Sequence, residues 1–293
     1  MQFFNKYCVF IVSAGRTGTK YFGTLLDRIV ENSFSVHEPD IFSGFNKKLL
    51  SQIKTFGFYN MVLGRAARRT GIRNLSENYL AGKLTLQELK DRIVQHRARF
   101  FNNITQDMII ESYYGWYGCI PAIQEIFPNY KIIVITRDPR TWITSNMNWE
   151  KWYGKKDFVS KLKLERLNPH LINDIQYKHQ WARFSRFEKL CWAYKTVYST
   201  ILENVASDPH ARIFKFEDLF YGPQRYHNLN KLLNFLVDFR SRKFSYHIPQ
   251  GILEEKVHRN ISDSFPPYEH WDAEKNKEYW SLCEDIHFAL GYD

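Results

Sequence analysis

The sequence has 293 residues, of which 44% are hydrophobic and 17% aromatic, and 41 basic against 31 acidic residues give it a net charge of +10. This hydrophobic content excludes a disordered chain, and the length suits one large α/β domain or two small ones. The positive charge favours anionic partners such as nucleotides, acidic sugars, nucleic acids or anionic membranes, without choosing among them. The apolar runs are far shorter than the roughly 20 residues that span a bilayer, and the N-terminal residues lack a signal-peptide pattern.

The four cysteines are scattered along the chain without a C-x-x-C pair. Their spacing predicts neither a zinc site nor a disulfide framework. We therefore expect reduced, buried thiols in a cytoplasmic protein that needs no metal.

The first predicted element is a buried strand at residues 9–12, followed by a loop and an amphipathic helix that runs to about Ile29. The loop contains Gly15, Arg16, Thr17, Gly18 and Thr19. A strand, a glycine-containing loop and a helix together aim backbone N–H groups and the positive end of the helix dipole at one point, which predicts a phosphate-like ligand. The Walker A pattern is not met because the lysine, at position 20, comes one place late. For the loop taken alone, an ordinary turn between a strand and a helix is the alternative.

A second strand is predicted at residues 34–37, and it ends at the sequence His37-Glu38-Pro39-Asp40. Residues 41–103 show few strand signals and many basic residues, so we predict a helical insertion beside the sheet. Its clearest helix opens at about Thr85 with a capping box completed by Glu88. The insertion is either a solvated cationic surface or a lid on the substrate side.

The remaining pattern alternates strands and helices. Strands are expected at 107–112, 130–136 and 211–216, and helices at 117–127, from Pro139 onward, 177–206, 225–237 and 275–290. Near-continuous apolar strands that alternate with helices predict a three-layer α/β fold with about five parallel strands and helices on both faces. No repeat or linker divides the chain, so residues 1–293 are expected to form a single domain.

Polar residues follow the strands where ligands bind in open parallel sheets, beyond the carboxyl ends. Arg16 follows the first strand, Glu38 the second, Ser112 the third and Arg137 the fourth. Ser145 comes eight residues after Arg137, which places it about two helical turns along, close to the same rim. Two basic side chains with several hydroxyls suit a ligand that has two separate anionic groups.

Together these motifs resemble the paired nucleotide-binding signature of sulfotransferases that use 3′-phosphoadenosine 5′-phosphosulfate (PAPS). The similar stretches are RTGTKY at 16–21, FPNYKIIVITRDPRTWITS at 127–145, ARIFKFEDLFYGP at 211–223 and the C-terminal HW…GYD ending. They cover most of the predicted sheet but not the insertion at 41–103. The resemblance implies a P-loop-like nucleotide-binding fold, PAPS as donor, adenosine 3′,5′-bisphosphate as product, and no metal.

The resemblance also assigns cofactor-binding residues. Arg16 would bind the 5′-phosphosulfate and stabilise charge on its bridging oxygen, while Arg137 and Ser145 would hold the 3′-phosphate. Tyr21 would stack on adenine, and Arg259 would belong to a late loop that closes on the 3′-phosphate. The full predicted set is Gly15, Arg16, Thr17, Gly18, Thr19, Lys20, Tyr21, Arg137, Ser145 and Arg259.

A catalytic base is also required, because an acceptor hydroxyl must lose its proton. The stretch that carries the catalytic histidine in cytosolic members reads Glu111-Ser112-Tyr113 here, so that histidine is absent. His37-Glu38-Pro39 instead resembles the site of the glutamate base in bacterial and Golgi-type carbohydrate sulfotransferases. We predict Glu38 as the base, ionised beside an Arg-rich crevice, with His37 as the alternative and Arg16 as the third catalytic residue; a purely structural Glu–Arg pair stays open.

Two other classes of function compete with this reading. A P-loop kinase or NTPase would need a magnesium site, and the displaced Lys20 argues against it. A basic nucleic-acid-binding protein would be expected to show a recognisable motif or a stripe of charge, and neither is present. The acceptor could be a sugar, a glycolipid headgroup, an acidic polysaccharide or a small phenol, and the sequence does not indicate an oligomeric state.

Overall fold

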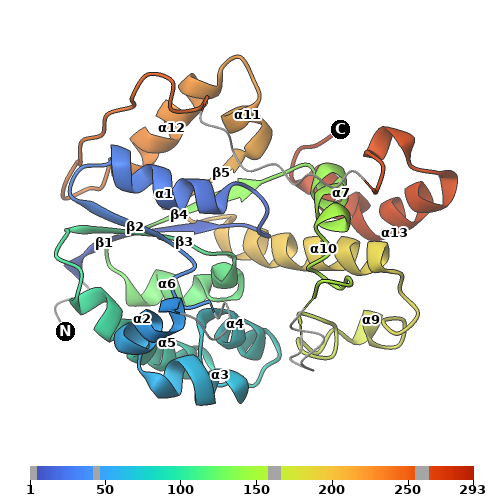
Figure 1. The fold of residues 1–293 in the computed structure, drawn as a ribbon, viewed down its shortest axis with the longest axis horizontal. Helices are drawn as coiled ribbons and strands as arrows, with labels where there is room; N and C mark the ends of the chain where they lie inside the picture. The colour runs from blue at the N-terminus through green and yellow to red at the C-terminus, as the bar shows by residue number, and fades with distance from the viewer. Residues whose placement is uncertain (1–4, 42–46, 158–165, 255–263) are drawn as a thin grey trace.

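The structure is a computed structural model that describes residues 5–41, 47–157, 166–254 and 264–293. The predicted parallel sheet is confirmed: five strands pair in the order β2-β3-β1-β4-β5, and every pairing is parallel (Figure 1). The strands are β1 (Tyr7–Val12), β2 (Ser33–His37), β3 (Met108–Ser112), β4 (Tyr130–Thr136) and β5 (Ala211–Lys215). The carboxyl ends of β1 and β4 are therefore neighbours, and the end of β2 lies two strands from that of β1.

Helices cover both faces of the sheet, as predicted. One face carries α1 (Thr19–Ile29), α11 (Phe216–Phe220) and α12 (Arg225–Val237), which lie above the sheet in Figure 1. The other face carries α6 (Ile120–Ile126) and α10 (Arg186–Val205), and α13 (Ala273–Ala289) packs on α10. Successive residues of a strand point to opposite faces, so Phe10 belongs to one core and Ile11 to the other. This burial on both sides explains the unbroken apolar run of the strand.

The predicted insertion is helical. It comprises α2 (Lys47–Phe56), the π-helix η2 (Tyr59–Leu63), the short α3 (Gly64–Ala66), α4 (Ile72–Leu80) and α5 (Leu86–Asn102). The capping box that opens α5 is present, because the backbone N–H of Thr85 donates to Glu88 and that of Glu88 donates to the Thr85 hydroxyl. Buried residues of the insertion, such as Phe56 and Ile93, pack in the same core as Phe10 of β1.

Two predicted helices are shorter than expected. The helix expected at 177–206 is divided into α9 (Ile175–Lys178) and α10, because Ser185 and Glu188 form a new capping box that starts α10. The helix expected at 117–127 is a 3₁₀ turn (Tyr114–Gly118) followed by α6. Apolar residues continue across both breaks, so the apolar pattern alone did not reveal them. The helix after β4 is α7 (Pro139–Trp149), and a 3₁₀ turn (Tyr268–His270) precedes α13. No helix among the described residues is long and apolar enough to cross a membrane.

Gly23 lies where α1 packs against the end of β2. A Cβ atom at this position would be 2.7 Å from the Cβ and 2.9 Å from the backbone nitrogen of His37. We expect Gly23→Ala to lower the free energy of unfolding by roughly 1–3 kcal/mol, measured by urea denaturation, because neither backbone can move freely. Gly222→Ala is the control, since its nearest neighbour would be 3.9 Å away. Equal losses in the two variants would contradict this account of close packing.

Candidate active site

The loop after β1 is wound around the buried hydroxyl of Ser13. This oxygen accepts hydrogen bonds from the backbone of Gly15, at 3.0 Å, and from the hydroxyl of Thr17, at 2.8 Å. Gly15, Arg16 and Gly18 have positive φ angles of 76°, 56° and 77°. Within the described residues, the backbone N–H groups of Arg16, Thr17 and Gly18 meet no acceptor. Loops of this kind gather N–H groups into a concavity that binds anions.

Arg16 and Arg137 lie side by side at the carboxyl ends of β1 and β4. Arg137 Nη1 donates to the backbone oxygen of Arg16 at 3.0 Å, and Arg16 Nη2 donates to the hydroxyl of Ser145 at 2.9 Å. The structure therefore brings together the three residues that the sequence grouped. Ser145 contacts Arg16, however, and not Arg137, which it was expected to accompany.

The surroundings of the two guanidinium groups are aromatic. Arg16 lies over the ring of Trp149, 4.8 Å from its centre, and Arg137 lies 5.0 Å from the centre of the Phe216 ring. Neither arginine forms an ion pair with a carboxylate in the described ranges, and the buried Nε of Arg16 has no hydrogen-bond partner there. Burial and the charge of Arg137 lower the pKa of Arg16 to about 10, and burial lowers the pKa of Arg137. Both remain cationic at neutral pH, so the pair suits an anionic ligand.

Several residues that support this pair were not predicted. The indole N–H of Trp142 donates to the backbone oxygen of Gly15 at 2.8 Å, and Arg137 Nε donates to the Thr141 hydroxyl at 3.1 Å. Trp142, Ser145 and Trp149 are spaced i, i+3 and i+7 on α7, so they share one face of the helix. Since the sequence predicts Ser145 at the rim of the sheet, this spacing could have identified Trp142 and Trp149 as neighbours of the site.

The other predicted cofactor-binding residues differ in their exposure and contacts. Thr19 begins α1 and is buried, and Lys20 is exposed in its first turn. Tyr21 donates its hydroxyl to the backbone oxygen of Ile252, and its ring meets the edge of the Phe220 ring at 5.4 Å. Arg259 lies outside the described residues.

Glu38 and His37 lie at the end of β2, on the same edge of the sheet. The backbone N–H of Glu38 and Nδ1 of His37 both donate to the backbone oxygen of Ser112, at 3.1 and 3.0 Å. Because Nδ1 carries the proton in this hydrogen bond, Nε2 of His37 is the unprotonated nitrogen; it lies 3.6 Å from Glu38 Oε2. Burial lowers the pKa of His37 to about 4, so the imidazole is neutral at neutral pH. Glu38 has a φ of 46°, a conformation that costs a non-glycine residue energy and is enriched at functional sites.

The charge of Glu38 differs from the expected one. Burial, followed by the nearby charge of Asp40, raises its pKa to about 7, although Lys48, Arg73 and Arg65 partly offset the rise. The side chain is only 17% exposed, and the cations around it do not replace the lost water. The carboxyl group is therefore only partly ionised at neutral pH, whereas the sequence predicted an ionised carboxylate. A pKa near the working pH suits a group that must accept a proton.

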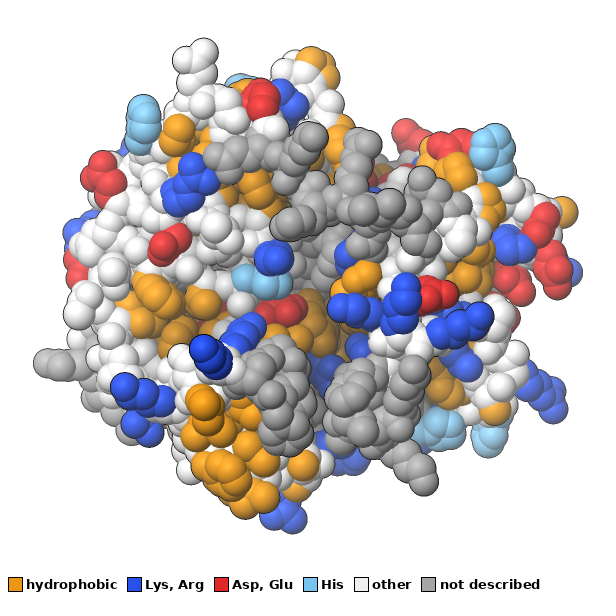
Figure 2. All heavy atoms as spheres, viewed as in Figure 1, with side chains coloured by type: hydrophobic (Ala, Val, Ile, Leu, Met, Phe, Trp, Pro, Cys, Tyr) orange, Lys and Arg blue, Asp and Glu red, His pale blue; other side chains and the backbone are white. Residues whose placement is uncertain are grey.

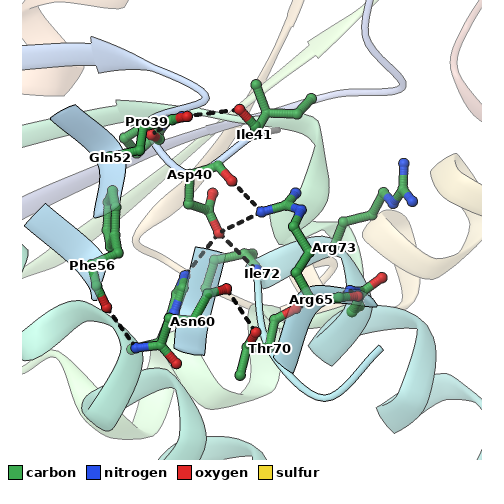
Figure 3. Close-up of polar contacts among 12 residues, drawn as sticks. Pro39, Asp40, Ile41, Gln52, Phe56, Asn60, Arg65, Thr70, Ile72 and Arg73 are labelled. Carbon is green, nitrogen blue, oxygen red and sulfur yellow. Dashed lines mark hydrogen bonds and ion pairs between the residues drawn. The ribbon is translucent and has the colours of Figure 1, made fainter. Parts of the chain in front are cut away.

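The insertion holds the loop that carries Glu38 (Figure 3). Gln52 of α2 donates to the backbone oxygens of Pro39 and Ile41, at 2.8 and 2.9 Å. Arg65 donates to the backbone oxygen of Asp40. The loop is thus fixed on both sides of Asp40 by residues that follow it in the sequence.

The side chain of Asp40 is fully buried and anchors the same loop. It accepts hydrogen bonds from His96 Nε2 at 2.8 Å, from the backbone of Ile72 at 3.1 Å and from Arg97 at 3.3 Å. Burial alone would raise the pKa of Asp40, but Arg97, His96 and Arg65 hold it well below its usual range. Arg97 also donates to Glu111 at 2.6 Å, so Glu111 is a buried structural residue. Among the described residues, no group of acidic, His and Cys side chains could hold a metal ion.

The architecture is that of the P-loop-like α/β proteins, with a strand–loop–helix unit and two arginines at the carboxyl edge of the sheet. The sequence profile of the sulfotransferase family matches residues 8–192, and the chain belongs to this family. No curated protein matches the sequence.

Solved structures of bacterial sulfotransferases are similar to the chain over nearly its whole length. The sulfotransferase domain from the curacin biosynthetic pathway is 14% identical, with 98% of each chain covered and a TM-score of 0.46. A sulfotransferase from Alicyclobacillus acidocaldarius is 12% identical, with 97% of this chain and 96% of that one covered and a TM-score of 0.43. The sulfotransferase domain of the Synechococcus PCC 7002 olefin synthase is 14% identical, with 99% and 96% covered and a TM-score of 0.44.

Proposed function

We propose that this sulfotransferase moves the sulfuryl group of PAPS to an acceptor hydroxyl, with Glu38 as the catalytic base. The observation that supports the proposal is the pair Arg16 and Arg137, which forms no ion pair with a carboxylate in the described ranges. The pair lies beside a loop whose backbone N–H groups at 16–18 meet no acceptor within those ranges. The carboxylate of Glu38, with its pKa near 7, lies on the same edge of the sheet. Sulfuryl transfer from PAPS would need no metal ion. We also propose that the protein is cytoplasmic.

The two cations would have separate tasks. Arg16 and the N–H groups of residues 16–18 would bind the 5′-phosphosulfate and stabilise the charge that develops on its bridging oxygen. Arg137, with Ser145 nearby, would hold the 3′-phosphate. PAPS supplies, when bound, an activated sulfuryl group whose leaving group is adenosine 3′,5′-bisphosphate.

Glu38 would act on the acceptor side of the transferred group. Because β3 separates β2 from β1, the two strand ends are about 10 Å apart, at roughly 4.8 Å per strand. That separation leaves room for a sulfuryl group and an acceptor hydroxyl between them. The hydroxyl proton would pass to Glu38 as the new S–O bond forms and the bond to the bridging oxygen breaks.

The proposed acceptor is a small molecule, a carbohydrate or a lipid that carries a hydroxyl group. A carbohydrate-type acceptor follows from the resemblance at His37-Glu38. A hollow near the middle of the face drawn in Figure 2, with basic side chains on both sides of it, suits an acceptor that is itself polar or anionic. Nucleic acid is not an expected partner.

Thermal unfolding with two nucleotides tests the cofactor. Adenosine 3′,5′-bisphosphate should raise the Tm, since a ligand at 100 times its Kd stabilises a protein by about 2.7 kcal/mol. ATP with Mg²⁺ should have little effect. The reverse pattern would favour a P-loop kinase or NTPase. Salt-sensitive binding to arbitrary DNA with no affinity for the bisphosphate would favour a nucleic-acid-binding protein.

Arg137→Ala tests the place of the 3′-phosphate. Removal of a hydrogen bond between charged groups costs about 1.5–3 kcal/mol, so we expect the Kd of the bisphosphate, measured by calorimetry, to rise roughly 10- to 150-fold. Arg140→Ala is the matched control, because Arg140 is occupied by an ion pair with Asp138 and lies over the ring of Tyr268. An unchanged Kd in Arg137→Ala would refute the assignment.

A further inference from the structure

The first part of the insertion is strongly and uniformly basic. Residues 41–76 contain no Asp or Glu, although the whole chain has 31 in 293 residues and a stretch of this length would on average hold about four. The same stretch contains Lys47, Lys48, Lys54, Arg65, Arg68, Arg69 and Arg73. Arg65, Arg68 and Arg73 form ion pairs with Asp40 or Glu77. The exposed lysines at 47, 48 and 54 are the charges that attract an anionic partner.

Large apolar side chains are exposed in the same stretch. Leu50 is 69% exposed, Phe58 and Tyr59 are each 54% exposed, and Leu63 is 56% exposed. The described residues contain eight large hydrophobic side chains with this kind of exposure, and four of them fall within these 14 positions. Apolar side chains that cluster on a surface indicate an interaction site, whereas scattered ones do not.

Basic and apolar side chains share the outward side of α2. In α2 the buried residues are Leu49, Gln52 and Phe56, and the stripe formed by Lys47, Leu50 and Lys54 points away from them. Figure 2 shows apolar side chains gathered at the lower edge of the molecule, over the helix labelled α3 in Figure 1. We call the exposed side chains of this segment the docking face and define it by Lys47, Leu50, Lys54, Phe58, Tyr59 and Leu63.

We propose that the docking face binds the surface of an anionic lipid membrane. Leucine and aromatic side chains enter the boundary between headgroups and acyl chains, while lysines reach the lipid phosphates. A nucleic acid would use the positive charge but would leave Leu50 and Leu63 without an apolar environment. A second copy of the chain would bring two basic faces together and repel them.

The position of the docking face relates it to the candidate active site. Lys48 lies close enough to Glu38 to lower its pKa, so the start of α2 adjoins the loop that carries the proposed base. Membrane binding would therefore bring the proposed acceptor site close to lipid headgroups. The binding itself does not depend on the proposed chemistry and is measured without PAPS.

The test is co-sedimentation of the full chain with vesicles of phosphatidylcholine, with and without 30% phosphatidylglycerol. We expect binding to the anionic vesicles only, weakened by 0.5 M salt. Lys47→Ala/Lys54→Ala should weaken it by about fivefold per lysine. Leu50→Ser/Phe58→Ser/Leu63→Ser should weaken it at least tenfold, and the control Ile175→Ser/Phe288→Ser removes two equally exposed side chains elsewhere and should leave it unchanged.

Two outcomes would overturn the proposal. The first is failure of the wild-type chain to bind anionic vesicles; a DNA gel shift or a dimer, by size exclusion, that the triple variant loses would then identify the partner of this face. The second is equal binding to anionic vesicles by the triple serine variant and the wild type. A retained circular dichroism spectrum and a retained Tm increase with the bisphosphate would show that each variant is folded and that the nucleotide site is separate.

Discussion

Replacement of Glu38 by glutamine is expected to lower turnover by roughly 10²- to 10⁴-fold, the usual contribution of a positioned general base. Glutamine keeps the size and polarity of the side chain but cannot accept the proton of an acceptor hydroxyl. The Kd of adenosine 3′,5′-bisphosphate should remain nearly unchanged, because the proposed anion-binding residues belong to β1, β4 and the segments that follow them. Sulfation of an acceptor under saturating PAPS and calorimetry with the bisphosphate measure the two effects separately.

The pH dependence of the wild-type enzyme gives a second readout. Because Glu38 must be deprotonated to act, kcat/KM should rise with pH through a midpoint near its pKa of about 7. The Glu38→Gln variant should lose this rise. His37 has a pKa of about 4 and would place the midpoint three units lower if it were the base. A midpoint near 4, or a larger loss of turnover in His37→Gln than in Glu38→Gln, would transfer the role to His37.

The same substitution should make the protein more stable at high pH. The pKa of Glu38 in the folded chain, about 7, lies above the ordinary value of 4.5, so folding favours the protonated form. The stability that Glu38 contributes is fully present below pH 4.5 and is lost as the pH rises through 7. Glutamine never ionises, so Glu38→Gln should unfold at a higher temperature than the wild type at pH 8 and not at pH 4. Loss of turnover together with loss of stability would instead indicate a damaged fold.

The sequence predicted the sheet well because its strands follow local rules. The strand at 130–136 is buried on both faces, so it reads as one apolar run whose limits are the ends of the strand. Pro139 then predicts the start of α7. The two breaks in the predicted helices were not predicted, because apolar residues continue across them. A capping box at Ser185 was visible in the sequence, and it was the better signal.

The candidate site was predictable only in part, for a similar reason. Arg16, Glu38 and Arg137 follow directly from the rule that polar residues collect at strand ends. The pKa of Glu38 did not follow, because it depends on burial by residues of the insertion that are distant in the sequence. His96 and Arg97, which anchor the adjacent Asp40, come nearly 60 residues later, and no local pattern connects them to it.

Removal of the buried charge at Arg97 is the second large effect expected. The Arg97 guanidinium lies between two buried carboxylates, 3.3 Å from Asp40 Oδ1 and 2.6 Å from Glu111 Oε1. Removal of one partner from a buried ion pair typically costs 3–5 kcal/mol, because the other charge is left without compensation. We expect a loss of about that size in the free energy of unfolding of Arg97→Met, measured in urea at pH 8.

The pH dependence and a second substitution identify the cause of this loss. Burial raises the pKa of Glu111 even with Arg97 present. The free energy of unfolding that is lost by ionising Glu111 inside the fold therefore grows as the pH rises. The defect of Arg97→Met should therefore be smaller at pH 6 than at pH 8, and Arg97→Met/Glu111→Gln should recover part of it. A loss below 1 kcal/mol, or a double variant no more stable than the single one, would contradict a role for uncompensated charge.

Because Asp40 also loses a partner, the Arg97→Met variant should lose activity even under conditions where it is fully folded. The adjacent Glu38 would no longer be held in place.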